Sequence, residues 1–151
     1  MGLEKTKKLN EQGLELIKFI EQPIINVEGG DVFRIMKKSN FEEFSFQEAY
    51  FSSIDFNFIK GWKMQLKMNS NICVPVGNVK FTFVSEDFKK HKTYLIGEDN
   101  YGIITIPPKI WYSFKGISKK TSLILNIADS EHNVNDIKKI NRDEFPLKIN
   151  L

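Results

Sequence analysis

Residues 61–69 hold the side chains best suited to chemistry. Four apolar residues alternate there with Lys63, Gln65, Lys67 and Asn69. Successive side chains of a β-strand point to opposite faces, so the polar set shares one face. If that face lines an enclosed hollow, burial can lower the pKa of a lysine amine until it serves as a general base. If it meets solvent, this is an ordinary half-buried strand, and the sequence alone leaves both interpretations open.

Tyr112 is the second candidate for proton transfer, and it follows Trp111 in a short β-type run. A phenol can act as an acid, and adjacent rings can stack on a sugar or a base, although we interpret Trp111 as core. The only histidines are His91, in a lysine-rich loop, and His132, after the last predicted strand. We expect His91 on the surface and take His132 as a candidate ligand contact. Without a His-x-His pair, we expect no first-row metal centre and no cofactor.

The bulk composition is that of an ordinary globular domain. The chain has 151 residues, of which 41% are hydrophobic and 27% charged, which predicts one domain with its own core and argues against disorder. The net charge of +3 comes almost wholly from lysine, since Arg34 and Arg142 are the only arginines. Without a basic, aromatic-rich cluster we expect no nucleic-acid binding, while the mild positive charge suits an anionic small ligand.

Nothing in the sequence predicts a membrane protein or a secreted one. No apolar run reaches the about 18 residues that a membrane span needs, and the polar N-terminus lacks the apolar centre of a signal peptide. Cys73 is the single cysteine and lies in an apolar run, where we interpret it as a buried, inert thiol. We therefore expect a cytoplasmic location.

Residues 4–21 carry apolar side chains at helical spacing as far as Pro23, which predicts an amphipathic helix. We expect it to form an N-terminal helical extension, residues 1–22, packed on the outside of the domain. The alternative is an arm that forms a dimer. From Pro23 the apolar period changes to two, so a single compact domain is expected over residues 23–151.

Short β-type runs fill that domain, separated by turn-forming residues and without a long helix between them. This pattern indicates a β-sandwich or a barrel and argues against a parallel α/β sheet. Gly77 and Asn78, which both tolerate positive φ, predict a hairpin. Residues 134–145 predict a short helix or an irregular tail. The predicted strands are residues 24–27, 32–36, 49–54, 58–68, 72–76, 79–84, 103–106, 111–114 and 122–127.

Five segments, in order along residues 30–132, resemble the dTDP-4-dehydrorhamnose 3,5-epimerase family of sugar-epimerase cupins. Residues 59–65 are similar to a segment with an Arg-Gly-Leu-His core, and residues 106–114 to an Ile-Pro-x-Gly-x-x-His-x-Phe segment. The others, residues 30–34, 76–81 and 125–129, are similar to the family's opening strand pair, a strand-turn-strand and the final barrel strand. The resemblance implies an all-β fold, a cupin-type jelly-roll barrel whose interior can hold a ligand.

The family removes a proton next to the ketone of a dTDP-linked 4-keto sugar. A His acts as base, cationic or polar groups steady the enolate, and a Tyr returns a proton on the other face. This chain departs from the family at those positions. Lys63, or Gln65 with a shifted alignment, stands where the first His falls, and Tyr112 stands where the second falls. The family's Tyr falls near Ser130 or Glu131, and neither is an equivalent acid.

The resemblance implies an epimerase or isomerase of a nucleotide-linked keto sugar in surface-polysaccharide biosynthesis, assembled as a homodimer. We expect Lys63 to be the base and Tyr112 the acid. One rival is a non-catalytic cupin that binds a nucleotide sugar but has lost the catalytic His and Tyr, and another is a structural partner subunit. The residues expected to bind substrate are Arg34, Gln65, Lys67, Asn69, Asn126 and His132.

Overall fold

The computed structural model describes residues 13–151, and in that range the regular structure is almost entirely β. The only helices there are single 3-10 turns at Leu14–Leu16, Lys38–Asn40, Val134–Asp136 and Arg142–Glu144. None of these described helices is long and apolar enough to cross a membrane. The strands are β1 (Lys18–Glu21), β2 (Ile24–Ile25), β3 (Val32–Phe33), β4 (Glu48–Ile54), β5 (Ile59–Gln65), β6 (Ser70–Val76), β7 (Asn78–Val84), β8 (His91–Gly97), β9 (Gly102–Ile106), β10 (Trp111–Gly116), β11 (Ser122–Ala128) and β12 (Ile137–Lys139).

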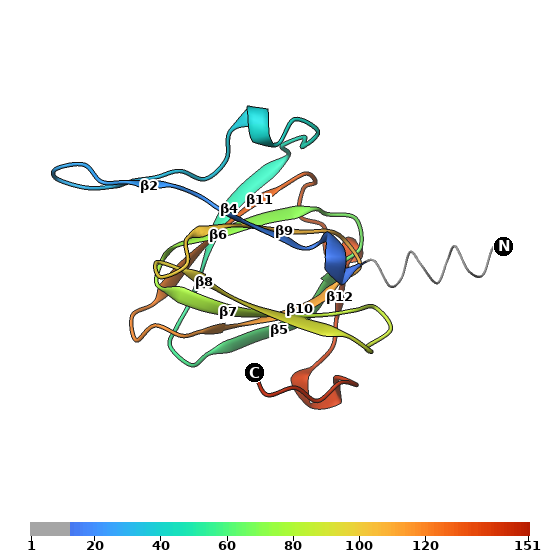
Figure 1. Cartoon of the computed structure of the whole chain (residues 1–151). Coiled ribbons are helices and arrows are strands. Elements are labelled where there is room, and N and C mark those ends of the chain that lie inside the picture. Colours follow the sequence, from blue (N-terminus) through green and yellow to red (C-terminus); the bar gives the residue numbers. More distant parts are fainter. Residues whose placement is uncertain (1–12) are drawn as a thin grey trace.

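Two five-stranded sheets form the body of the molecule. The first has the strand order β1-β9-β6-β11-β4 and the second the order β12-β5-β10-β7-β8. They lie over one another as two layers (Figure 1). Neighbouring strands within each sheet run antiparallel. This architecture confirms the predicted all-β jelly roll.

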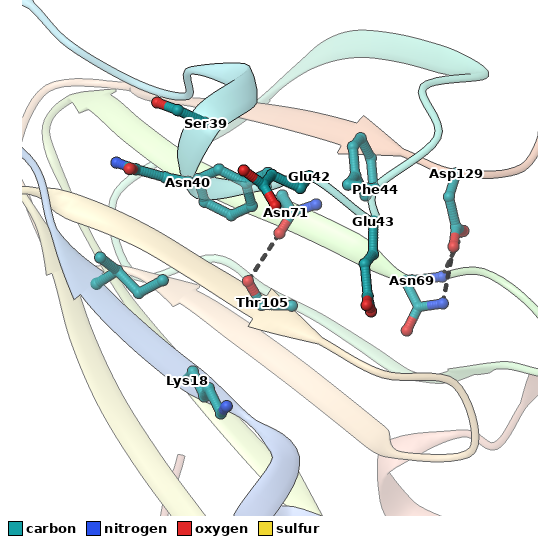
Figure 2. A pocket seen from close by; sticks show the side chains of 12 residues that line it. Lys18, Ser39, Asn40, Glu42, Glu43, Phe44, Asn69, Asn71, Thr105 and Asp129 are labelled. Atoms are coloured by element: carbon teal, nitrogen blue, oxygen red, sulfur yellow. Dashed lines mark hydrogen bonds between the residues drawn. The ribbon is translucent and has the colours of Figure 1, made fainter.

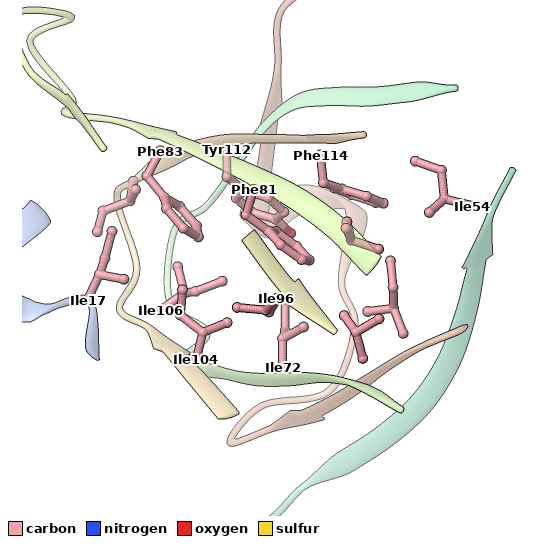
Figure 3. Close-up of a cluster of buried hydrophobic side chains, with 14 of the residues drawn as sticks. Ile17, Ile54, Ile72, Phe81, Phe83, Ile96, Ile104, Ile106, Tyr112 and Phe114 are labelled. Carbon is pink, nitrogen blue, oxygen red and sulfur yellow. The ribbon is translucent and has the colours of Figure 1, made fainter. Parts of the chain in front are cut away.

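Apolar side chains from both sheets fill the space between the layers. Isoleucines of β6 and β9 lie there with aromatic rings of β7 and β10 (Figure 3). The rings of Phe81 and Phe114 stack with their centroids 5.4 Å apart, and the Phe83 ring lies 6.4 Å from that of Tyr112. Burying one such large side chain stabilises the fold by about 1.5–3 kcal/mol, so this interior cluster holds the two sheets together.

A second apolar cluster covers the outer face of β5 and β10. Trp62, Met64 and Trp111 point outward there and are covered by the chain after β12. The Phe145 ring stacks on Trp62 with a centroid distance of 4.0 Å and is only 1% exposed. Residues 134–145, predicted as a short helix or an irregular tail, instead contain β12 between two 3-10 turns. They belong to the domain because their apolar side chains complete this cluster.

The helix predicted over residues 4–21 is wrong for the part of that range that the structure describes. One 3-10 turn, Leu14–Leu16, leads into β1, which pairs with β9 along its length. Leu14 and Ile17 are buried in the interior cluster, so they belong to the barrel. A backbone that runs beside an open sheet edge satisfies its hydrogen bonds there, and this pairing outweighs the local helical spacing. Residues 1–12 lie outside the described residues.

The predicted turn at Gly77 is present, but it does not close a hairpin. β6 pairs with β9 and β11, whereas β7 pairs with β10 and β8, so the chain crosses between the sheets at this point. Gly77 has φ +80°, and a Cβ there would lie 2.1 Å from Ser122 Oγ. Glycine is required for this close crossing.

The β2–β3 hairpin forms an arm that projects away from the barrel (Figure 1). The Tyr101 hydroxyl fixes its base by donating to the Arg34 carbonyl oxygen at 2.9 Å. Four apolar residues of the arm are between 38% and 50% exposed: Ile25, Val27, Val32 and Phe33. The arm therefore offers apolar surface that the rest of residues 13–151 does not cover.

Candidate active site

Strand β5 turns two of its polar side chains toward the barrel interior. Trp62 and Met64, which are 3% and 1% exposed, belong to the outer cluster beneath the C-terminal segment. Lys63 and Gln65 alternate with them and point the other way. Lys63 lies opposite Tyr112 of β10, a member of the interior cluster. Of the two interpretations that the sequence left open, the inward one holds for these two residues.

The Lys63 amine lies over an aromatic ring in a largely buried setting. Its Nζ is 5.3 Å from the centroid of the Tyr112 ring. Burial lowers the pKa of this amine below its ordinary value of 10.5, because desolvation disfavours the charged form, and the nearby Tyr50 phenol opposes part of that shift. An amine that loses its proton more easily than a solvated lysine meets the first requirement of a general base.

The ring of Tyr112 lies beneath that amine. It is 5% exposed, and its ring lies among the aromatic side chains of the interior cluster (Figure 3). Burial raises the pKa of its phenol well above the ordinary value, and hydrogen bonding to Gln65 opposes part of this shift. The phenol therefore keeps its proton at neutral pH and can donate it.

Two residues of the first sheet complete the group. Asn126 of β11 lies opposite Tyr50 of β4, and its Nδ2 donates to the Tyr50 hydroxyl at 2.8 Å. Asn126 is 5% exposed, and its buried Oδ1 has no hydrogen-bond partner among the residues that the structure describes. Tyr50 is close enough to Lys63 for a charge on the phenol to affect the amine. We call these five residues the interior polar cluster: Tyr50, Lys63, Gln65, Tyr112 and Asn126.

The C-terminal segment fixes β5 from outside. β12 pairs with β5, so the strand that carries Lys63 has a neighbour on each side. The backbone amides of Trp62 and Ile140 donate to each other's carbonyl oxygens at 3.3 and 3.1 Å. Packing on one face and pairing along both edges restrict the backbone from which the amine projects.

The structure does not bring Lys67 into the interior polar cluster. β5 ends at Gln65, so the strand alternation stops before Lys67. The Lys67 side chain is 73% exposed, and its Nζ lies 3.4 Å from the Asp136 carboxylate. Lys67 is therefore not a second cation beside Lys63, and burial is what lowers the pKa of the Lys63 amine.

Three other predicted substrate contacts also lie apart from the cluster. Arg34 is exposed at the base of the arm. The Asn69 backbone and side chain each donate to the Asp129 carboxylate at 2.8 Å. His132 is exposed after β11, where its backbone N–H donates to the Glu48 carboxylate. Substrate contacts from these residues stay predictions.

Asn69 instead borders a groove of about 670 Å³ on the outer face of the first sheet. Figure 2 shows side chains of the 39–44 loop above this groove and the Thr105–Asn71 pair below it, with 2.7 Å between the two side chains. Lys18, Glu42 and Glu43 give the groove charges of both signs. Within residues 13–151, no group of three or more His, Cys, Asp or Glu side chains could hold a metal ion.

Sequence reasoning missed Tyr50. It lies in the predicted strand 49–54, where Tyr50, Ser52 and Ile54 are less exposed than the residues between them. Aromatic and hydroxyl residues stand on both faces of that strand, so the sequence has no polar-to-apolar alternation there. The side chains of β4 that face the interior can be identified only from the pairing of β4 with β11.

No protein-family model matches the sequence, and no curated protein does. Solved structures do match it. A dTDP sugar isomerase from Desulfovibrio desulfuricans G20 superposes with TM-score 0.80 and 27% identity, over 85% of this chain and 86% of that one. A dTDP-4-dehydrorhamnose 3,5-epimerase from Elizabethkingia anophelis NUHP1 gives 0.73 and 18%, over 90% and 81%. A sugar 3,4-ketoisomerase from Thermoanaerobacterium thermosaccharolyticum, in complex with TDP, gives 0.68 and 17%, over 81% and 86%.

All three comparisons extend over most of both chains, so they concern the whole barrel and not one motif within it. The chain therefore has the jelly-roll fold of the sugar-epimerase cupins, as the resemblance in its sequence predicts.

Proposed function

We propose that this chain is an epimerase or isomerase that moves a proton at the carbon next to the ketone of a nucleotide-linked keto sugar. One observation carries the proposal. The Lys63 amine, with its pKa lowered by burial, faces the barrel interior beside Tyr112 and Gln65. It stands where the resemblance places the base of the sugar-epimerase cupins, and a dTDP sugar isomerase has the same fold at 27% identity.

Lys63 in its neutral form accepts the proton. The carbon–hydrogen bond supplies its electron pair to a new carbon–carbon double bond, and the ketone oxygen takes up the negative charge. Partial removal of the amine from water favours this step, because desolvation lowers its pKa and so increases the neutral fraction of the amine. The ammonium that forms then lies close to the enolate and stabilises it.

Tyr112 returns a proton to carbon. Its phenol stays protonated because burial raises its pKa. The C–H group next to a ketone is still a weaker acid than a phenol, so protonation of the enolate carbon by Tyr112 is favourable. Return from Tyr112 inverts the carbon if the phenol reaches the opposite face, whereas return from Lys63 restores it.

The nucleotide and the biological setting complete the proposal. The chain carries a net charge of +3, which suits the diphosphate of a nucleotide sugar. A role in making surface polysaccharide follows from this substrate class. So does a cytoplasmic location, because a charged nucleotide sugar does not cross a bilayer unaided.

Hydrogen exchange with solvent tests the proposal. The protein is incubated in D₂O with a dTDP-linked 4-keto-6-deoxy sugar, and proton NMR follows the sugar hydrogens next to the ketone. Loss of one of these signals, faster than in buffer alone, is expected. Tight binding without exchange would instead support the non-catalytic binder. The absence of both binding and exchange would contradict the enzyme and the binder alike. The outcome matters because the His and Tyr of the family are replaced here.

We also propose that the chain forms a homodimer. The projecting arm exposes four apolar residues that its own barrel does not cover. Apolar surface of this kind is stabilised by burial against a partner, and twofold pairing is the commonest assembly of soluble proteins.

A further inference from the structure

The interior polar cluster contains one group whose hydrogen bonding is incomplete. Asn126 is 5% exposed, and its Oδ1 is buried with no partner among residues 13–151. A buried acceptor left unpaired costs about 1–3 kcal/mol, so native proteins seldom leave one unused. An amide oxygen can only accept, which means that its missing partner is a hydrogen-bond donor.

The neighbouring Tyr50 hydroxyl has the opposite need. It accepts from Asn126 Nδ2 at 2.8 Å, so its own hydrogen is directed elsewhere. In the described part of the chain, no acceptor takes that hydrogen. Asn126 and Tyr50 therefore present one acceptor and one donor side by side, on paired strands of the sheet that faces Lys63.

We infer that Tyr50 and Asn126 bind the two adjacent oxygens of an α-hydroxyketone, which rests on the proposed function and specifies its chemistry. The ketone oxygen accepts from the Tyr50 hydroxyl. The hydroxyl on the next carbon donates to Asn126 Oδ1. A ketone with a bare methylene or an ether carbon beside it satisfies only half of this pair.

This placement selects the carbon that reacts. The neutral Lys63 amine takes the hydrogen from the carbon that bears the hydroxyl. The C–H electron pair becomes the double bond, and the carbonyl π pair moves onto the ketone oxygen. The Tyr50 O–H, already directed at that oxygen, strengthens its hydrogen bond as the charge develops. In a 4-keto-6-deoxy sugar this carbon is C3, because C5 carries the ring oxygen and a methyl group instead of a hydroxyl.

The first test is the position of the exchange. In D₂O, a dTDP-linked 4-keto-6-deoxy sugar is expected to lose its H3 signal at least about tenfold faster than its H5 signal. Faster exchange at C5 would overturn this inference and leave the proposed function standing. Absence of both binding and exchange would overturn the two together.

The second test removes the donor. Tyr50→Phe is expected to slow exchange at C3 by about 100-fold, in the range seen when a hydrogen-bond donor to a developing oxyanion is deleted. Its matched control is Tyr94→Phe, which removes the same oxygen atom from β8, a strand that does not contribute to the interior polar cluster. Melting temperatures verify that both variants are folded. Equal exchange rates for the two variants would contradict the role given to Tyr50.

The third test removes the hydrogen-bond donor from the sugar and, separately, the acceptor from the protein. A dTDP-linked 4-keto-3,6-dideoxy sugar lacks the C3 hydroxyl and is expected to bind the wild-type protein about tenfold more weakly, as one net hydrogen bond predicts. In Asn126→Leu the two sugars are expected to bind equally. If the variant does not fold, the wild-type comparison still decides, since equal binding of the two sugars there would contradict the contact.

Discussion

At the scale of single residues, the resemblance places Lys63 where the sugar-epimerase cupins have a histidine, and we propose that this lysine is the base. Imidazole loses its proton near neutral pH without help, whereas an amine must be removed from water to do so. Lys63 is set between the Tyr112 ring and the first sheet, and burial there lowers its pKa. The fold thus supplies through burial what the side chain lacks by its own chemistry.

The pH dependence of exchange follows from this shift. Only neutral Lys63 accepts a proton, so kcat/KM is expected to rise with pH and to level off once the amine is neutral. Because burial lowers the pKa of Lys63, the midpoint of this rise is expected at a pH below 10.5, the ordinary value. Exchange rates measured from pH 6 to pH 10 check the direction.

Lys67→Met is the matched control for that profile, because Lys67 is 73% exposed and lies outside the cluster. Its profile is expected to coincide with that of the wild type. A wild-type rate that falls across the whole range would show that the protonated form of a group is required, and the assignment of Lys63 as base would fail.

Part of this site could be read from the sequence. The alternation over residues 61–65 predicts that Lys63 and Gln65 share a face, and the resemblance puts Tyr112 beside them. Lys67 could not be placed correctly, because nothing local marks the end of β5 at Gln65. Tyr50 could not be found, because its neighbour Asn126 is 76 residues away in the chain.

At the scale of elements, strand β5 has two apolar supports, one on each side of its sheet. Its inner face meets the interior cluster, and its outer face meets Phe145 and the segment after β12. Lys63 and Trp62 are adjacent in sequence and belong to different clusters. The side of the strand that carries Lys63 is therefore held in place by packing on the opposite side.

Removal of the Phe145 ring tests this support. Phe145 is 1% exposed and stacks on Trp62, so Phe145→Ala is expected to lower the free energy of unfolding by about 3–5 kcal/mol. Urea denaturation measures the change. Phe46→Ala makes the same replacement at a ring that is 61% exposed, and about 0.5 kcal/mol or less is expected there. Similar losses for both variants would mean that the C-terminal segment does not support β5.

The elements also show where local patterns mislead. Apolar spacing before Pro23 predicts a helix, but an open edge of β9 is available and the chain pairs with it as β1. Gly77 predicts a turn correctly, yet the partners of β6 and β7 lie in different sheets. Period-two runs locate most of the strands, although β8 lies in none of the predicted ones. Pairing depends on contacts between residues far apart in the chain.

At the scale of the whole molecule, the fold is retained although most of the sequence differs. The structural match to a dTDP sugar isomerase covers 85% of this chain at 27% identity. The interior cluster is apolar and shared between both sheets, so many sequences can satisfy it. The ordered set of short segments predicted this fold because the segments mark strands and crossings of the barrel.

The arm gives a prediction for the assembly. The protein is expected to have twice the 17.6 kDa mass of one chain when measured by light scattering after size exclusion. Replacing Val32 and Phe33 together by Asp is expected to shift it toward the monomer, because charge would then be buried in the contact.

Val134→Asp is the control for that change, since Val134 is 73% exposed but lies outside the arm. It is expected to leave the mass unchanged. A wild-type protein that stays monomeric at micromolar concentration would rule out the dimer and leave the site within one barrel untouched.

The central claim is that the amine of Lys63 removes a proton from a nucleotide-linked keto sugar inside the barrel. Its most direct test is the rate of deuterium entry next to the ketone, measured by NMR for the wild type and for Lys63→Met. Methionine keeps the side chain as far as Cε and lacks the amine, so a loss of at least about 100-fold is expected in a variant that is folded and still binds dTDP. Exchange by folded Lys63→Met at the wild-type rate would contradict the account.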